Sequence, residues 1–175
     1  MKIRFAVLTT SDKGSRGERE DKSGKIIMER MSQIPEAELI QYDMIPDDLN
    51  QIREKLTYYA DQLQVDLILT TGGTGFSPKD VTPEATREVI QKEVPGIAEA
   101  MRMESFKITK AAMLSRGIAG IRGKTLIINL PGSSKGVSES LDVILSELPH
   151  AVWAMTGAEH PKEIGKKESG IGVRE

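Results

Sequence analysis

Apolar residues recur along the chain in short runs and in helical stripes. The runs and two-residue alternations predict strands over residues 3–10, 38–45, 65–71 and 125–130. Stripes with a period of three to four residues predict helices over 22–34, 49–63, 82–92, 97–107 and 137–148, with a short apolar helix after Pro149. Strands and helices therefore alternate along most of the chain.

Signals for the ends of these elements agree with this division. Pro35 ends the first predicted helix, and Pro46 ends the second strand. Asp47 is the expected N-cap of the helix that follows, because an Asp side chain accepts hydrogen bonds from the first turn. Thr82 is the expected cap of the next helix, with Pro83 at its first position.

The alternation predicts an α/β fold with a mostly parallel sheet that helices cover on both faces. A short β-hairpin arm is expected near residues 117–123. The 175 residues fit one domain, which we expect to span residues 1–158. The polar, glycine-containing segment 159–175 is expected to be a C-terminal tail.

The predicted fold also predicts where a ligand binds. In open α/β sheets, ligands bind beyond the carboxyl ends of the strands. Four segments follow predicted strands directly and should meet at that edge, and each is rich in glycine, hydroxyl or carboxylate groups: residues 11–12, 47–48, 72–80 and 131–135.

Two of these segments have the composition of phosphate-binding loops. Residues 72–75 read GGTG, and glycines allow an anion to approach consecutive backbone N–H groups; a tight strand-to-helix turn would need the same residues. Residues 131–135 read PGSSK, which suits an oxyanion at a helix N-terminus but also a plain Ser cap. Two such loops on one edge favour a phosphate site over two unrelated turns.

Three aspartates stand beside these loops. Asp80 is left over once Thr82 caps the next helix, and an acid beside a phosphate loop suggests a Mg²⁺ ligand. Asp47 has the N-cap as a competing interpretation, and Asp12 is also explained by the frequency of Asp in turns.

Two other catalytic motifs were tested against the chain. Residues 120–125 lack the first glycine of a P-loop, and a strand follows them rather than precedes them, which excludes that motif. Residues 132–136 match G-x-S-x-G with Ser134 as the nucleophile, and Asp142 and His150 follow in the order of a hydrolase triad. Both partners fall on, or just past, the helical stretch that carries the serine, so a small serine hydrolase is a minor alternative.

Composition narrows the chemistry. The 24 basic and 26 acidic residues give a net charge of −2, which argues against a nucleic-acid or membrane-surface protein. The chain contains no cysteine, which excludes disulfides, thiolate catalysis and Cys-type metal sites. Its longest apolar run, 151–155, is far shorter than the ~20 residues of a membrane span, so we expect a cytoplasmic protein.

Several motifs together resemble one known family. They are TTGGTG at 70–75, DVTPEAT at 80–86, VPG at 94–96, MLSR at 113–116 with AG at 119–120, and INLPG at 128–132. In this order and spacing they resemble the molybdenum-cofactor biosynthesis proteins of the MogA/MoaB type, over residues 3–156. The resemblance implies a three-layer α/β/α sandwich with the molybdopterin-binding fold.

The resemblance also implies a reaction. Such enzymes are molybdopterin adenylyltransferases: they transfer AMP from ATP to the terminal phosphate of molybdopterin, release pyrophosphate and need Mg²⁺. The acids essential in them match Asp47 and Asp80, which are the expected catalytic and Mg²⁺-binding residues. The expected nucleotide- and molybdopterin-binding residues are Ser11, Asp12, Gly72, Gly73, Thr74, Gly75, Ser115, Pro131, Gly132, Ser133 and Ser134.

The resemblance leaves one alternative within the family and suggests partners. Some relatives of the MoaB kind bind the pterin without catalysis, but both acids are present here, which favours the enzyme. A homotrimer or hexamer is expected, with a separate molybdenum insertase acting downstream. The chain is too short to hold the insertase domain itself.

Overall fold

A six-stranded sheet runs through the computed structural model, which describes residues 1–157. The expected tail, 159–175, lies outside the described residues. The strand order is β2-β1-β3-β6-β5-β4, with these bounds: β1 Ile3–Thr10, β2 Ala37–Ile45, β3 Leu67–Thr71, β4 Lys92–Glu93, β5 Ala119–Arg122 and β6 Thr125–Leu130. Strands β2, β1, β3 and β6 pair in parallel, whereas β5 pairs antiparallel with β6 and β4. The mostly parallel sheet is therefore confirmed.

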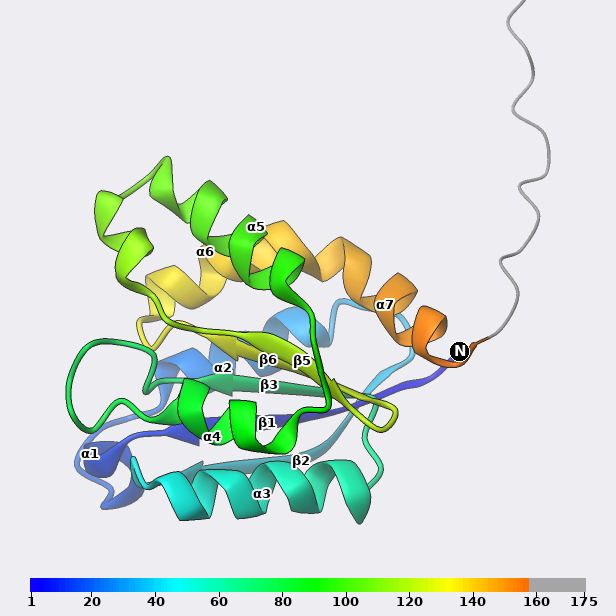
Figure 1. Cartoon of the computed structure of the whole chain (residues 1–175), viewed down its shortest axis with the longest axis horizontal. Coiled ribbons are helices and arrows are strands. Elements are labelled where there is room, and N and C mark those ends of the chain that lie inside the picture. The colour runs from blue at the N-terminus through cyan, green and yellow to red at the C-terminus, as the bar shows by residue number, and fades with distance from the viewer. Residues whose placement is uncertain (158–175) are drawn as a thin grey trace, which may run out of the picture.

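Helices cover both faces of this sheet (Figure 1). One layer contains α3 (Leu49–Asp61) and α4 (Thr82–Val89); the other contains α2 (Lys22–Met31), α5 (Pro95–Phe106), α6 (Ser134–Ile144) and α7 (Leu148–Met155). Short helical turns complete the described chain: α1 (Asp12–Ser15), η1 (Lys110–Leu114) and η2 (Leu145–Glu147). The three-layer α/β/α sandwich is also confirmed.

Strand β1 shows how the sequence divides the two layers. Phe5 and Val7 pack in the cluster under α2 and α6, whereas Ala6 and Leu8 pack in the cluster under α3. Consecutive side chains of a strand point to opposite faces, and both faces here are covered. This explains why the predicted strands are apolar on both sides.

Two expected elements differ in the structure. The helix expected to reach residue 92 ends at Val89, because residues 91–94 pair with β5 instead: the Gln91 N–H donates to Ile121 O, and the Val94 N–H donates to Ala119 O. The expected hairpin is present, but β5 is a strand of the sheet rather than a separate arm. Tertiary pairing has overridden local helix propensity here.

Two expected side-chain roles are wrong. Asp48 caps α3 by accepting from the Gln51 N–H at 2.9 Å, so Asp47 is not the cap. Val81 precedes α4 without a side-chain cap, and the Thr82 hydroxyl lies 3.2 Å from that of Thr10 instead.

Candidate functional site

A cavity of about 740 Å³ opens at the carboxyl ends of the parallel strands. Its walls come from β1 and its following loop, from Asp47 after β2, from the loop after β3 and from the loop after β6. These loops gather at the left edge of the sheet in Figure 1. The crossovers from β1 and β3 leave in different directions along the sheet, so the cavity lies at a topological switch point, where such folds bind ligands.

The cavity brings together eight of the residues expected from the sequence: Ser11, Asp47, Gly72, Gly73, Asp80, Gly132, Ser133 and Ser134. Asp12 is one contact away, because it bonds Asp47 directly. Thr74 and Gly75 lie in the same loop but do not line the cavity, and Ser115 and Pro131 line a second, smaller pocket. The four predicted segments therefore do meet at one edge.

Asp12 and Asp47 hold each other in place. The Asp12 N–H donates to Asp47 Oδ2 at 3.1 Å, and the Asp47 N–H donates to Asp12 Oδ1 at 3.0 Å. Lys79 Nζ donates to the other Asp12 oxygen at 2.8 Å, and this bond lowers the pKa of Asp12 below its usual value. The ionised Asp12 side chain therefore links the loop after β2 to the loop after β3 through its hydrogen bonds.

Asp47 has the opposite electrostatic character. Burial raises its pKa above the usual value, and the nearby charges of Asp12 and Asp80 act in the same direction. Asp80 reaches the same cavity from the loop after β3, where its Oδ2 accepts from the Ser77 N–H at 2.9 Å. A divalent cation between Asp47 and Asp80 would relieve this repulsion.

The donor set agrees with Mg²⁺ held partly by a substrate. Among residues 1–157 there is no group of three or more His, Asp or Glu side chains that could hold a metal ion alone. Mg²⁺ is commonly held by one or two carboxylates together with substrate phosphates. Asp47 and Asp80 line one cavity, and the charge of Asp80 helps to raise the pKa of Asp47, so this pair fits that pattern.

The loop after β3 has a backbone that demands glycine. Gly72 and Gly73 have φ angles of 96° and 67°, in the left-handed region. A Cβ on Gly72 would overlap the Thr10 carbonyl oxygen, and one on Gly73 would overlap Thr82 Oγ1. These glycines bring the loop against β1 and α4 and leave their backbone at the cavity wall.

Arg116 fastens the same loop from outside. Its Nε donates to Gly75 O and its Nη2 donates to Asp80 O, both at 2.7 Å, while its backbone N–H donates to Thr74 O. The guanidinium also pairs with the carboxylate of Glu84 on α4. In the sequence, Arg116 is only the last residue of the MLSR motif. The hydrogen bonds by which it holds the loop after β3 are seen only in the structure.

Two cations at the cavity mouth were missed by the sequence reasoning. Arg19 and Lys22 line the cavity from the segment between α1 and α2. Every other arginine within residues 1–157 has a hydrogen bond or ion pair, as shown for Arg4, Arg16, Arg30, Arg53, Arg87, Arg102, Arg116 and Arg122. Arg19 lies in a polar loop with no motif. What marks it as a candidate ligand-binding residue is that, unlike the other arginines of residues 1–157, its side chain has no hydrogen bond or ion pair.

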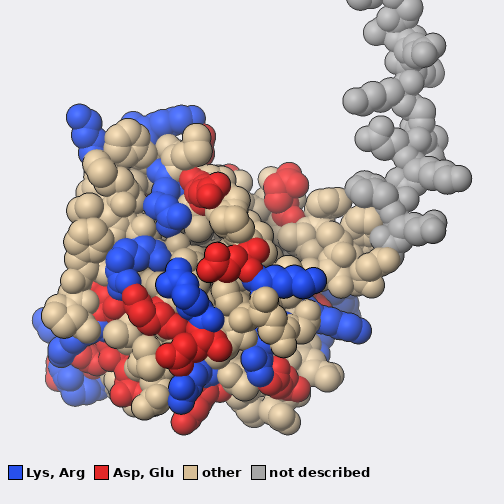
Figure 2. Space-filling view, viewed as in Figure 1, with Lys and Arg blue, Asp and Glu red and all other residues tan. Residues whose placement is uncertain are grey.

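Asp21, beside these cations, is already occupied. Its carboxylate accepts from Thr9 Oγ1 at 2.6 Å, from the Tyr42 hydroxyl and from the Gly24 N–H at the start of α2. These bonds make Asp21 a structural cap. Glu20, which also lines this side of the cavity, pairs with Lys25, so Arg19 and Lys22 are the charged side chains here that have no hydrogen bond or ion pair within residues 1–157. On the face shown in Figure 2, acidic and basic side chains are interspersed without one large patch of either sign.

The triad of the hydrolase alternative is not assembled. Ser134 and Asp142 are eight residues apart on α6, which separates them by about 12 Å along the axis. Asp142 pairs with Arg30, and His150 lies on α7, stacked on Trp153. A nucleophile and its base need hydrogen-bond contact, so this alternative loses its geometric basis.

Comparison with known proteins now identifies the family. The model of the probable molybdopterin binding domain matches residues 6–150. The chain belongs to this family. A molybdopterin adenylyltransferase of Helicobacter pylori is 44% identical over 156 residues, which are 89% of each chain.

Solved structures agree with the family assignment. The molybdopterin biosynthesis enzyme MoaB of Thermus thermophilus is 51% identical, with a TM-score of 0.84 over 89% of this chain and 98% of that chain. A further sequence relative, the molybdopterin adenylyltransferase of Escherichia coli, is 37% identical over 80% of this chain and 72% of its own.

None of the helices in residues 1–157 has the length and apolar character needed to span a bilayer.

Proposed function

We propose that this protein is a molybdopterin adenylyltransferase, which transfers AMP from ATP to the terminal phosphate of molybdopterin and releases pyrophosphate. One observation carries the proposal: the strand-end cavity combines the carboxylates of Asp47 and Asp80 with a glycine loop and with two cationic side chains that have no hydrogen bond or ion pair in the described residues. That set suits the alignment of two phosphorylated substrates. The matched adenylyltransferases support the same reaction.

In the proposed reaction an oxygen of the terminal molybdopterin phosphate attacks the α-phosphorus of ATP. A new P–O bond forms there, and the bond from that phosphorus to the oxygen bridging to the β-phosphate breaks. The bonding electrons leave with pyrophosphate, so no redox partner is needed. The protein must align the two phosphates and balance their charge, as in other phosphoryl-type transfers.

Each wall of the cavity has a role in this proposal. Asp47 and Asp80 would hold Mg²⁺, which neutralises phosphate charge when bound. The loop of Gly72 and Gly73 would contact phosphate through its backbone. Arg19 and Lys22 would bind the departing pyrophosphate, because they line the cavity and their side chains have no hydrogen bond or ion pair within residues 1–157.

The non-catalytic pterin-binding alternative is separated by one measurement. We expect pyrophosphate release when the protein is mixed with ATP, Mg²⁺ and molybdopterin, and none when molybdopterin is omitted. Arg19→Ala should raise the KM for ATP severalfold with the melting temperature unchanged, because the Arg19 side chain has no hydrogen bond or ion pair within residues 1–157 that the substitution would remove. Binding of molybdopterin without pyrophosphate release would favour the alternative.

We also propose a homotrimer that acts in the cytoplasm and passes its product to a molybdenum insertase. Large apolar side chains are exposed on the end of α5, on η1 and on the segment between them: Met103, Phe106, Ile108, Met113 and Leu114. Such clusters mark interfaces more often than free surface. Analytical ultracentrifugation should give a trimer mass for the wild type and a monomer for Phe106→Asp combined with Met113→Asp; a monomeric wild type would contradict the assembly.

A further inference from the structure

Two buried hydroxyl groups lie directly behind the glycine loop, residues 72–75. Thr10 is the last residue of β1 and Thr82 is the first residue of α4, and both are buried. Their hydroxyl oxygens are 3.2 Å apart, and the Thr82 N–H donates to Gly73 O at 3.1 Å. A Cβ built on Gly73 would overlap Thr82 Oγ1 and would lie 3.0 Å from Thr10 Oγ1. The two hydroxyls therefore pack against the backbone of the loop.

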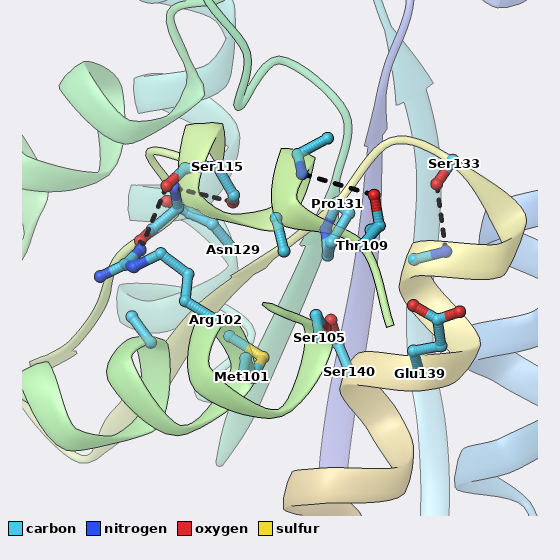
Figure 3. A pocket seen from close by; sticks show the side chains of 15 residues that line it. Met101, Arg102, Ser105, Thr109, Ser115, Asn129, Pro131, Ser133, Glu139 and Ser140 are labelled. Atoms are coloured by element: carbon cyan, nitrogen blue, oxygen red, sulfur yellow. Dashed lines mark hydrogen bonds between the residues drawn. The ribbon is translucent and has the colours of Figure 1, made fainter. Parts of the chain in front are cut away.

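The hydrogen-bonded row continues into the core behind α4. Thr86 Oγ1 donates to Thr82 O at 2.8 Å, and Asn129 Nδ2 donates to Thr86 Oγ1 at 2.9 Å and to Thr70 Oγ1 at 3.0 Å. At its far end, Asn129 reaches the wall of the smaller pocket (Figure 3). Within residues 1–157, no buried side-chain nitrogen or oxygen lacks a hydrogen-bond partner. A buried network that is fully satisfied holds its members in one arrangement.

The hydroxyl proton of Thr10 can be assigned to one acceptor. Burial raises the pKa of Asp47, and a side-chain hydrogen bond with Thr10 acts against that shift. An ionised carboxylate only accepts hydrogen bonds, so the single proton of the Thr10 hydroxyl goes to Asp47. The Thr10 oxygen then accepts from the Thr82 hydroxyl. Removal of the Thr82 hydroxyl would leave Thr10 without the donor that fixes its orientation.

Neither helix capping nor packing explains the Thr82 hydroxyl. Helix α4 begins without a side-chain cap, and Thr82 directs its hydroxyl to β1 rather than to its own first turn. A buried hydroxyl is unfavourable unless it is hydrogen-bonded, so an apolar side chain would fill the same space at less cost. The three groups that Thr82 and its partner hold, Thr10, Asp47 and Gly73, all line the phosphate cavity.

We propose that Thr82 is a positioning residue of the phosphate cavity: its hydroxyl holds Thr10 toward Asp47, and its backbone N–H holds the glycine loop. The inference rests on the proposed adenylyl transfer. Thr82 itself does not line the cavity, so it acts through these neighbours. Loss of a group that orients metal-binding side chains typically costs 10- to 100-fold in metal affinity or activity.

The test compares removal of the Thr82 hydroxyl with its retention. Thr82→Val and Thr82→Ala remove the hydroxyl, and the alanine variant does so without a new methyl group against Thr10. Calorimetry with Mg²⁺ and inorganic pyrophosphate should show binding roughly 10- to 100-fold weaker in both variants. Thr82→Ser keeps the hydroxyl and should bind like the wild type. Rescue by serine separates positioning from loss of side-chain volume.

Thr125→Val is the matched control. Thr125 is also buried, and its hydroxyl donates to Val65 O at 2.6 Å, but it begins β6 and so lies at the opposite end of that strand from the cavity. It lines neither the cavity nor the smaller pocket. Thr125→Val should lower the melting temperature about as much as Thr82→Val and leave pyrophosphate binding unchanged.

Four results would overturn the proposal: no pyrophosphate binding by the wild type, normal binding by Thr82→Val and Thr82→Ala, binding by Thr82→Ser as weak as theirs, or equal weakening by Thr125→Val. Failure of both hydroxyl-free variants to fold, beside a folded Thr125→Val, would make Thr82 a structural residue and would also overturn it. Pyrophosphate release by the wild type from ATP and molybdopterin, measured in parallel, tests the proposed function separately. The expected order of binding without that release would contradict the adenylyl transfer and leave the positioning role standing.

Discussion

The loops after β3 and β6 look alike in composition and differ in construction. Both follow buried parallel strands, and both combine glycine with hydroxyl residues at the phosphate cavity. In the loop after β3, Gly72 and Gly73 adopt left-handed angles that only glycine takes without strain. In the loop after β6, Gly132 is not in that region, and a Cβ there would lie 3.4 Å from the Cα and 3.9 Å from the N of Gly72, without overlap.

Their supports differ in the same way. The first loop is held by the guanidinium of Arg116 through Gly75 O and Asp80 O. The second is a helix start, in which Ser133 Oγ accepts from the Gly136 N–H at 3.1 Å. The same glycine-rich composition therefore accompanies two constructions: in the loop after β3 the glycines determine the backbone conformation, and in the loop after β6 the Ser133 helix cap does. We expect glycine substitutions to be tolerated far less in the loop after β3.

The largest effect is expected from the negative charge of Asp80 in the loop after β3, because residues 131–135 contain no acid. Asp80→Asn keeps size and one hydrogen-bond acceptor for the Ser77 N–H but removes the negative charge. If Asp80 holds Mg²⁺, pyrophosphate release should fall by about 10²–10³-fold, since metal stabilisation of phosphate charge is worth several kcal/mol. Molybdopterin binding should survive.

Raising the Mg²⁺ concentration should restore part of the loss, because a weakened site fills by mass action. The melting temperature should hold or rise slightly, since an acid in a phosphate pocket is unfavourable before the ligand binds. Normal turnover together with a lowered melting temperature would instead make Asp80 a structural turn residue.

A paired glycine substitution tests the comparison directly. Gly73→Val places a β-branched side chain at a φ of 67° and against Thr82 Oγ1, which should cost about 1–3 kcal/mol of stability and at least tenfold in ATP affinity. Gly132→Ala should stay within about 0.5 kcal/mol of wild type. Urea unfolding and calorimetric ATP titration measure both; equal effects in the two loops would remove the distinction.

Ser134 tests the second loop as a phosphate-binding element. It lines the cavity at the start of α6. As one hydrogen-bond donor among several, its loss in Ser134→Ala should cost about 1.5–3 kcal/mol, or roughly 10- to 100-fold in transfer. A nucleophile would lose 10³-fold or more, and would be labelled by a fluorophosphonate. Labelling of Ser134, or complete loss of activity in the variant, would revive the hydrolase alternative.

Sequence reasoning reached the fold and the edge of the sheet because both follow from periodicity and from the rule for strand ends. It missed β4, whose two residues are strand only because β5 lies beside them. It placed the N-cap of α3 one residue early, at Asp47 instead of Asp48. Both residues are aspartates, so the sequence does not distinguish them, and the backbone conformation determines which one caps the helix. The MLSR motif marks Arg116 without revealing its partners, which are distant in sequence. Arg19 carries no local pattern, because what distinguishes it is the lack of a hydrogen bond or ion pair within residues 1–157.

The smallest expected effect is on the pH dependence of stability, through the influence of Asp80 in the loop after β3 on the pKa of Asp47. Burial raises the pKa of Asp47, and Asp12 and Asp80 add to the shift, whereas the loop of residues 131–135 contributes no acid. A raised pKa in the folded state means that the native protein binds more protons than the unfolded chain, so stability falls as the pH rises above 3.8 through the native pKa. Asp47→Asn removes that loss.

The variant should therefore be more stable than wild type at pH 7, and its advantage should shrink as the pH is lowered toward 3.8, where the wild-type carboxyl regains its proton. Urea unfolding of both proteins between pH 4 and pH 7, without Mg²⁺, measures the difference. Asp80→Asn should show the same sign with a smaller amplitude, because it removes only one contributor to the Asp47 shift, and Gly132→Ala should show no pH dependence of its own. A pH-independent difference for Asp47→Asn would mean that its effect is packing, and that the two loops do not differ in the field they impose on the cavity.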